Sequence, residues 1–419
     1  MTPSVPFAER RKINMINVIG VQIKGKKATA LCFTNVIEED AIAQIREMCD
    51  QDFAEGCKVR IMPDVHVGIG CTIGTTMTVK DKVVPNLVGV DIGCGMYTVK
   101  LPNQTLDFEK VDEVCHAIPS GRDIWESRQE KFDLTKLCCY RHLKQTKRIE
   151  KSLGSLGGGN HFIEIDKAAD GSLYLIVHTG SRNLGKQVAE FYQQLAIDLH
   201  KGKETYFEKK EALIKEYKAS GRRNEIQEAL KGLQWSPKPI TMPMELCFLY
   251  GKYMEAYLHD IDICQKFAVR NREILANIIL SQIGITGEEG FHTVHNYIDV
   301  EEQILRKGAI AAHVGKKVLI PINMRDGSIL AVGKGNPDWN FSAPHGAGRV
   351  MSRKRASETL KMEEYKVSME GIYSTSVNEK TLDESPMAYK SLHDIVGVIE
   401  DTVEVIDVMK PIYNFKASY

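Results

Sequence analysis

One cysteine of this chain lies between two glycines, directly after a short apolar stretch. Val88–Val90 leads into Asp91, and Cys94 follows three residues later between Gly93 and Gly95. Glycine on both sides lets the backbone turn sharply and lets a metal ion or a bulky anion come close. Asp91 and Cys94 can therefore point into one site from a single tight turn. A thiol in this setting is expected to be a ligand or a nucleophile rather than half of a disulfide.

Four further segments, distant in sequence, combine histidine with a glycine turn or the end of a strand. They are Gly157–Glu164, Leu175–Arg182, His292–Tyr297 and Pro344–Arg349. A single histidine on an apolar strand is more often a buried structural residue than a ligand. Five such segments in one chain favour a shared site.

The side chains in these segments form a mixed set of donors. Asp91, Cys94, His161, His178 and His295 offer oxygen, sulfur and nitrogen, which suits a divalent transition metal. A thiolate can bridge two ions, and two ions can clamp the attacking and leaving oxygens in phosphate chemistry. Five donors suit two openly coordinated ions better than one structural zinc.

The Pro344–Arg349 loop indicates a second kind of chemistry. A neutral imidazole at His345, beside a glycine-rich and arginine-bearing loop, can attack phosphorus and carry a phosphoryl or nucleotidyl group. Backbone N–H groups at the glycines can approach phosphate oxygens, and Gly333–Asn336 adds another such loop. The GxxxxGK[ST] pattern is absent, so this is not a P-loop.

The composition is that of a globular chain without a global attraction for nucleic acid. The 419 residues are 43% hydrophobic and 26% charged, with a formal net charge of zero. No linker or low-complexity tract divides the chain, so one large domain over residues 1–419 is expected. Any contact with nucleic acid must then come from a local basic surface.

The cysteines and the apolar runs predict a cytoplasmic protein that does not contact a membrane. The ten cysteines include the adjacent pair Cys138 and Cys139 but show no framework spacing, which fits a reducing compartment. Met1–Pro6 has no apolar core of signal-peptide length. No apolar run is long enough to cross a bilayer.

Hydrophobic periodicity and turn residues predict the main elements. A charged helical segment over Lys186–Leu233 is expected to be solvated, with a helical insertion at about 201–240. A basic helix is expected to begin at Ser352, where its cationic first turn opposes the helix dipole and calls for an anionic partner. The other expected elements are a hairpin over 17–34, helices over 37–50, 108–118, 244–279 and 394–409, and strands within 57–95 and 309–330.

Six motifs resemble the signature motifs of the RtcB family of RNA ligases, and they occur in the family order. They are Met62–His66, Val90–Met96, Gly159–Glu164, His178–Arg182, His295–Tyr297 and His345–Arg349. The resemblance implies that family's mixed α/β fold, a single large domain with central β-sheets and flanking helices. It also implies two Mn²⁺ ions, one held by Cys94, His178 and His295. The other would be held by Asp91, Cys94 and His161, with Cys94 as the bridge.

By the same resemblance His345 takes GMP from GTP, and Asp64 also has a catalytic role. The implied reaction joins an RNA 3′-phosphate or 2′,3′-cyclic phosphate to a 5′-hydroxyl, in RNA repair or tRNA splicing. It passes through a guanylylated histidine and an RNA-(3′)pp(5′)G intermediate. The expected partners are GTP and such RNA ends, with an activating protein as a further candidate. Nucleotide-binding positions are implied at Asn160, Glu164, His345, Gly346, Ala347, Gly348, Arg349, Tyr389 and Lys416.

One loop departs from the family pattern. Ile322–Gly327 follows Ile320-Pro321 where family members commonly carry Gly-Ser-Met-Gly. The resemblance implies that this loop neighbours the nucleotide, so the departure bears on nucleotide affinity or on the choice of RNA end. The chain therefore resembles a divergent paralogue.

Two other functions stay open on the residues alone. A metal-dependent phosphoesterase would need the five donors but not His345. A non-catalytic RNA-binding paralogue would tolerate the loss of donors, although none of the five is missing. For RNA, Arg349 and Arg353 are the expected phosphate contacts because arginine binds phosphate bidentately. Arg182 and Arg272 are weaker candidates.

Overall fold

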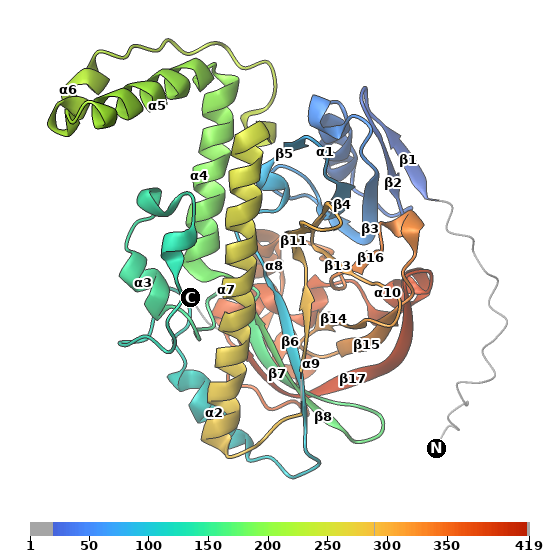
Figure 1. Cartoon of the computed structure of the whole chain (residues 1–419). Coiled ribbons are helices and arrows are strands. Elements are labelled where there is room, and N and C mark those ends of the chain that lie inside the picture. Colours follow the sequence, from blue (N-terminus) through green and yellow to red (C-terminus); the bar gives the residue numbers. More distant parts are fainter. Residues whose placement is uncertain (1–19, 289, 417–419) are drawn as a thin grey trace, which may run out of the picture.

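The computed structural model describes residues 20–288 and 290–416 and has a mixed α/β fold with two large β-sheets (Figure 1). The fold class expected from the sequence is confirmed. The Met1–Pro6 segment and residues 17–19 of the expected hairpin lie outside the described residues.

The first large sheet has six strands and carries the N-terminal part of the described chain. The turn expected at Lys24–Lys27 joins its first two strands, which pair antiparallel. The second and third strands are parallel and need a crossover, and helix α1 (Glu39–Cys49) supplies it. The strand order is β1 (Val21–Lys24), β2 (Thr29–Cys32), β3 (Val59–His66), β4 (Ile73–Thr78), β12 (Ile304–Lys307) and β11 (Asn296–Asp299).

The second large sheet has seven strands, and all neighbours in it are antiparallel. Two short pairs complete the β-structure, β5 (Lys82–Val83) with β9 (Leu249–Tyr250) and β13 (Ala309–Ala311) with β16 (Ser342–Pro344). The order of the seven-stranded sheet is β10 (Phe291–Val294), β6 (Gly95–Leu101), β8 (Leu173–Thr179), β7 (Phe162–Lys167), β17 (Val403–Lys416), β15 (Gly327–Gly333) and β14 (Lys317–Asn323).

Helix α7 (Gly251–Ile283) is the longest helix and takes part in the two largest hydrophobic clusters. It begins at Gly251 rather than at residue 244 because Leu249 and Tyr250 form a strand with β5. The remaining α-helices are α2 (Phe108–Ala117), α3 (Thr146–Lys151), α4 (Arg182–His200), α5 (Glu204–Ala219), α6 (Ile226–Lys231), α8 (Arg353–Thr359), α9 (Met362–Ser368) and α10 (Leu392–Ile399). None of the helices among the described residues combines the length and apolarity needed to span a membrane.

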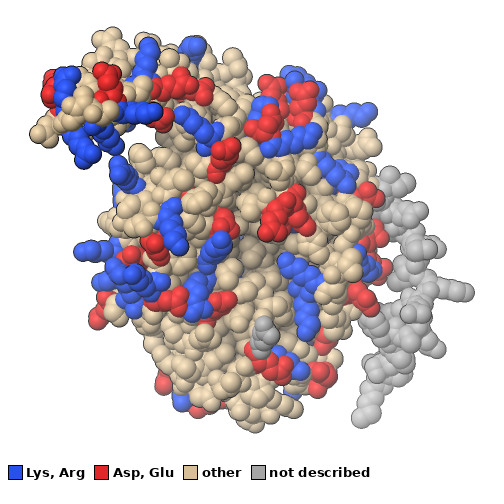
Figure 2. All heavy atoms as spheres, in the orientation of Figure 1, with Lys and Arg blue, Asp and Glu red and all other residues tan. Residues whose placement is uncertain are grey.

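Helices α5 and α6 project beyond the end of α4 (Figure 1), and neither buries a residue. In Figure 2 their positive and negative side chains are interspersed, as in the ion pairs Arg222–Glu225 and Lys231–Glu228. The solvated helices expected over Lys186–Leu233 are thus confirmed for α5 and α6, but the expectation is wrong for residues 186–200, because α4 buries side chains such as Val188 and Tyr192. Their status as an insertion in a single catalytic domain stays a prediction.

The expected helix over 394–409 is wrong. Helix α10 ends at Ile399, and Val403–Lys416 is a strand of the seven-stranded sheet. Val403, Val405 and Met409 are spaced in a way that also suits a strand, and β-branched side chains favour it. Both neighbours, β7 and β15, supply backbone partners, which decides the conformation.

Candidate metal and nucleotide site

Four adjacent strands of the seven-stranded sheet place histidine and cysteine residues at the same end of the strands. Because β10, β6, β8 and β7 alternate in direction, β10 and β8 end where β6 and β7 begin. Cys94 immediately precedes β6, and His161 immediately precedes β7. His178 lies in the final residues of β8, and His295 directly follows β10. The register therefore explains why donors from distant segments meet.

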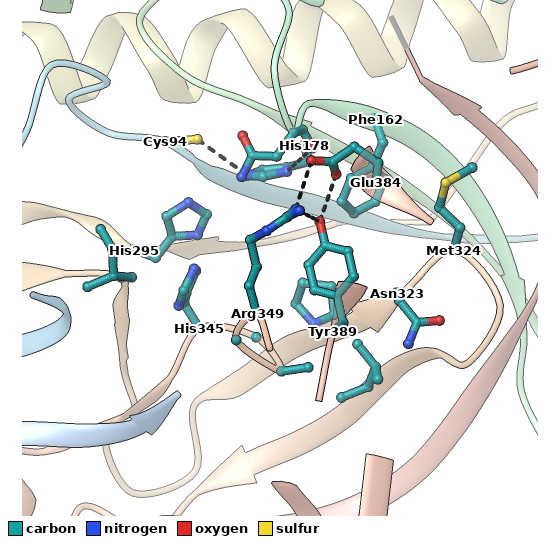
Figure 3. Close-up of a pocket in the computed structure, with 18 of the residues that line it drawn as sticks. Cys94, Phe162, His178, His295, Asn323, Met324, His345, Arg349, Glu384 and Tyr389 are labelled. Atoms are coloured by element: carbon teal, nitrogen blue, oxygen red, sulfur yellow. Dashed lines mark hydrogen bonds and ion pairs between the residues drawn. The ribbon is translucent and has the colours of Figure 1, made fainter. Parts of the chain in front are cut away.

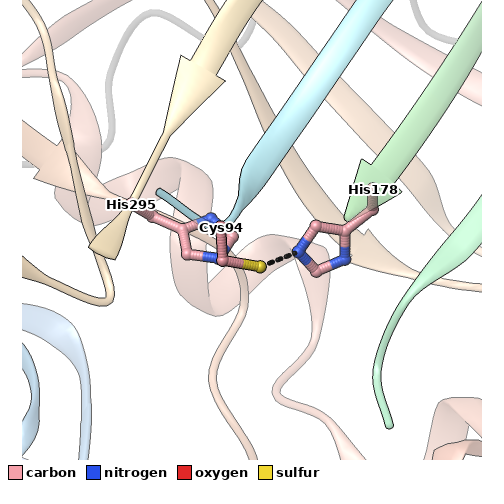
Figure 4. A group of neighbouring side chains, drawn as sticks. All are labelled: Cys94, His178 and His295. Carbon is pink, nitrogen blue, oxygen red and sulfur yellow. Dashed lines mark hydrogen bonds between the residues drawn. The ribbon is translucent and has the colours of Figure 1, made fainter. Parts of the chain in front are cut away.

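The five donors form two groups that share Cys94. One contains Cys94, His178 and His295, drawn in Figure 4, and the other contains Asp91, Cys94 and His161. The Cys94 Sγ atom lies 3.3 Å from His178 Nε2 and 3.5 Å from His161 Nε2. His161 Nε2 lies 2.9 Å from Asp91 Oδ2. These are the two groupings that the family resemblance implies.

Hydrogen bonds to backbone carbonyls orient two of the rings so that Nε2 faces Cys94. His161 Nδ1 lies 2.9 Å from the Leu156 carbonyl oxygen, and His178 Nδ1 lies 3.2 Å from that of Asn160. A carbonyl oxygen can only accept, so each Nδ1 carries a proton, and Nε2 is the nitrogen turned toward the other donors. This is the tautomer that a metal ligand needs, with the second ring nitrogen bound to an orienting group.

Burial keeps the side chains of Cys94, His178 and His295 uncharged at pH 7. Burial raises the pKa of the Cys94 thiol well above its usual value, and the Asp91 charge adds to this. Burial lowers the pKa of His178 and His295 well below the usual range, so both rings are uncharged. His295 Nδ1 is buried with no hydrogen-bond partner in the described part of the chain. A divalent cation would deprotonate the thiol and use these lone pairs, so the residues fit a metal centre.

Helix α7 holds the turns that carry these donors. Arg272 is fully buried and donates to the carbonyl oxygens of Gly93, at 2.7 Å, and Thr179, at 2.9 Å. Its neighbour Asn271 donates to the Gly180 carbonyl oxygen at 3.1 Å. The expectation of Arg272 as an RNA contact is therefore wrong, because its side chain is in the interior. Both residues hold the turns that carry the donors, and the sequence alone did not predict this role for either.

His345 lies next to this cluster and is bound to a buried carboxylate. It follows β16, and its Nδ1 is 2.7 Å from Oδ2 of Asp64, which lies in β3. The His345 backbone N–H donates to the same oxygen at 3.2 Å. The ring centroids of His345 and His295 are 4.9 Å apart, and those of His295 and His178 are 5.1 Å apart. The carboxylate keeps the proton on Nδ1 and leaves the His345 Nε2 lone pair free.

A cavity of about 300 Å³ joins the donor cluster to the positions expected around a nucleotide. Figure 3 shows Cys94, His295 and His345 toward one side of it and Asn323 and Met324 toward the other. His161 and Asp64 do not line the cavity but contact residues that do. Every other residue predicted to bind metal or nucleotide lines it: Asp91, Cys94, Asn160, Glu164, His178, His295, His345, Gly346, Ala347, Gly348, Arg349, Tyr389 and Lys416.

Glu384 is a central residue of this cavity that the sequence did not predict. It accepts a hydrogen bond from the Tyr389 hydroxyl at 2.8 Å and pairs with Lys416, and Arg349 Nη1 lies 3.3 Å away. Burial alone would raise the Glu384 pKa, but the charges of Lys416 and Arg353 outweigh it and lower that pKa to about 2. Glu384 is thus ionised and connects three cavity residues.

The anionic partner expected for the basic helix comes from within the chain. Ser352 caps α8 by accepting from the Arg355 backbone N–H, as predicted. Arg353 pairs with Glu384 at 2.5 Å and with Asp383 at 2.6 Å.

Glu164 and the divergent loop lie elsewhere in the cavity wall. Glu164 is buried in β7, where Asn414 donates to it, and burial raises its pKa to about 7. Asn323 and Met324 of the loop that departs from the family pattern also line the cavity. Asn323 Oδ1 closes that loop by accepting from the backbone N–H groups of Arg325 and Asp326. The loop that departs from the family pattern therefore borders the cavity.

Fold and site together define a mixed α/β protein in which two candidate metal-binding groups, sharing Cys94, lie beside a cavity. The chain belongs to the RtcB family: the family model described as tRNA-splicing ligase RtcB matches residues 44–140 and 139–417. It is 28% identical over 425 residues to the RNA-splicing ligase RtcB of Escherichia coli K12, covering 91% of this chain and 95% of that protein. It is 27% identical to the tRNA-splicing ligase RtcB of Archaeoglobus fulgidus, covering 87% and 88%. The family expected from the six motifs is confirmed, as a distant relationship over most of the chain.

Proposed function

We propose that this chain is an RNA ligase that uses GTP and Mn²⁺ to join 3′-phosphate or 2′,3′-cyclic phosphate ends to 5′-hydroxyl ends. Its setting would be RNA repair or tRNA splicing in the cytoplasm. The observation that carries the proposal is the bond from His345 Nδ1 to Asp64, beside the shared-cysteine donor cluster. The names of the relatives as RNA-splicing ligases support it.

His345 is proposed as the nucleophile. Its Nε2 lone pair attacks the α-phosphorus of GTP, a P–N bond forms, and the bond to pyrophosphate breaks. Asp64 holds the ring in the required tautomer and stabilises the imidazolium that develops. A 2′,3′-cyclic phosphate end is first opened by water, which breaks the P–O2′ bond and gives the 3′-phosphate. A 3′-phosphate oxygen of the RNA then attacks the same α-phosphorus, which breaks the P–N bond and gives RNA-(3′)pp(5′)G. The 5′-hydroxyl oxygen attacks the RNA phosphorus, and GMP leaves.

Two Mn²⁺ ions are proposed for the donor cluster. One would be held by Cys94, His178 and His295, and the other by Asp91, Cys94 and His161. When bound, such ions polarise phosphate oxygens and stabilise charge in the transition state. The mixed nitrogen, sulfur and oxygen donors suit a first-row transition metal.

The guanine side of the nucleotide is proposed to contact Tyr389 and Lys416. Both are bound to Glu384, which would act as a positioning residue for them. Asn160, Glu164 and the His345–Arg349 loop would surround the rest of the nucleotide. Backbone N–H groups in that glycine-containing loop suit phosphate oxygens.

Labelling with α-³²P GTP and Mn²⁺ tests the proposal. The wild-type chain should acquire acid-labile label, His345→Ala should acquire none, and the exposed-residue control His393→Ala should label normally. In the same reactions only labelled protein should join RNA 3′-phosphate and 5′-hydroxyl ends. Removal of the RNA phosphate without labelling would indicate the phosphoesterase instead, and RNA binding without either reaction would indicate the non-catalytic paralogue.

A further inference from the structure

Away from the cavity, a second group of possible metal ligands lies at the surface of α7. It consists of a thiol, an imidazole and a carboxylate. Cys138, His259 and Asp260 each place one donor atom within 4.8 Å of the others. Cys138 lies between the short helices η4 (Leu134–Lys136) and η5 (Tyr140–His142), in the segment that precedes α3 (Figure 1). The side chains of Cys138 and His259 are exposed, and Asp260 is fully buried.

The buried Asp260 carboxylate is held in place by hydrogen bonds, but its ion-pair partner among the described residues is not permanently charged. Its oxygens accept from the backbone N–H groups of Cys138, at 2.7 Å, and Cys139, at 2.9 Å, and from the Tyr192 hydroxyl at 2.8 Å. Within the described part of the chain, His259 is its one cationic ion-pair partner, and a histidine is charged only when protonated. Buried carboxylates are normally paired with a cation or bind a metal. A countercharge for this carboxylate would therefore have to sit on its His259 side, where the exposed imidazole contacts it.

Two of the donor separations are within about 0.4 Å of the edges of a tetrahedral site. Cys138 Sγ lies 3.7 Å from His259 Nδ1, and that nitrogen lies 3.0 Å from Asp260 Oδ1. For ordinary Zn–S, Zn–N and Zn–O bonds, a tetrahedral centre has an S···N edge of about 3.6 Å and an N···O edge of about 3.4 Å. A cation would replace the proton between His259 Nδ1 and Asp260, so little rearrangement is needed.

We propose that Cys138, His259 and Asp260 form a third metal site, for a Zn²⁺-like divalent ion with solvent as the fourth ligand. Thiolate, imidazole and carboxylate are the ligands that zinc uses. The ion joins the turn at Cys138 to α7. Asp260 and Arg272 are on the same helix, about 18 Å apart at 1.5 Å per residue, so the site braces the helix that holds the catalytic turns.

Alkylation of Cys138 in the full-length chain tests this site separately from the active centre. The chain is treated with iodoacetamide with and without Zn²⁺, and modification of the Cys138 peptide is measured by mass spectrometry. Zn²⁺ should slow alkylation of Cys138 by about tenfold or more, because bound thiolate is withheld from the reagent. Cys57, a half-buried free thiol elsewhere in the chain, should react at the same rate with and without Zn²⁺.

Two variants complete the test. His259→Ala should remove the protection of Cys138, whereas His142→Ala, an exposed histidine on the neighbouring η5, should retain it. Zinc content should also fall by one equivalent in Cys138→Ser. Equal alkylation of wild-type Cys138 with and without Zn²⁺, or protection that persists in His259→Ala, would overturn the site. Because the readout is the Cys138 peptide, it is independent of metal at Cys94.

Discussion

Asp64 binds both the ring Nδ1 and the backbone N–H of His345 through one carboxylate oxygen, Oδ2. Asp64 is fully buried, and its strand, β3, lies in a different sheet from the metal donors. The contact therefore fixes the position and the tautomer of His345 relative to that sheet. Two hydrogen bonds to one oxygen leave the ring little freedom to rotate.

Asp64→Asn should leave metal binding intact and slow guanylylation. The amide keeps the shape of the side chain, but it cannot stabilise a developing imidazolium and can favour the wrong tautomer. We expect a loss of about 10⁴-fold in the single-turnover rate of labelling by GTP, as seen when the orienting carboxylate of a catalytic triad becomes an amide. Rapid-quench labelling measures it, and an unchanged rate would rule out the proposed role of Asp64.

Cys94→Ala should remove metal from both donor groups, because one thiolate belongs to both. His178→Ala should mainly weaken one group and leave about one equivalent bound. Metal content after dialysis against Mn²⁺, measured by elemental analysis, separates these outcomes. Two equivalents retained at the active centre of Cys94→Ala would be incompatible with a bridging cysteine.

Glu384→Gln should destabilise the fold in a pH-dependent way. The Glu384 pKa is lowered to about 2 in the folded chain, so its ionisation contributes stability above its unfolded pKa of about 4.3. That contribution is lost as the pH falls through about 2. A shift of this size corresponds to on the order of 3 kcal/mol. In urea unfolding, the difference in unfolding free energy between wild type and Glu384→Gln should be largest at pH 7. It should become smaller below pH 4. A gap that stays constant down to pH 3 would contradict the pairing with Lys416 and Arg353.

Gly95→Ala should loosen the contact between β6 and β10 beside Cys94. A Cβ atom at this position would lie 2.4 Å from the Thr293 carbonyl oxygen, which is backbone and cannot move aside easily. We expect a loss of about 2 kcal/mol in unfolding free energy, as for other overpacked sites. Gly397→Ala is the matched control, since its Cβ would meet nothing within 4 Å and lies in helix α10. That variant should be as stable as wild type or more so. Equal effects in both would show that the close approach at Gly95 is unimportant.

The sequence predicted the residues whose signal is local. Cys94 stands between glycines, and His178 stands at the end of an apolar strand, so each could be recognised from its neighbours. Glu384 and Asn414 carried no such signal, because their partners Lys416 and Glu164 reach them only through tertiary pairing.

Two of the predictions that were wrong have the same physical origin. The segment after Ile399 has apolar residues at spacings that suit either a helix or a strand, and the backbone partners on β7 and β15 decide between them. Arg272 was a weaker candidate for an RNA contact, but it donates from α7 to the backbone at Gly93 and Thr179 in the interior. In both cases the deciding contacts come from residues distant in the chain.

The location of the covalent GMP tests the proposed function most directly. Wild-type chain is incubated with GTP and Mn²⁺, digested at neutral pH to preserve a P–N bond, and its peptides are sequenced by mass spectrometry. The proposed function predicts one GMP adduct, on the peptide that contains His345, and its loss after mild acid. GMP on a different residue, or no adduct under conditions in which the chain joins RNA ends, would contradict it.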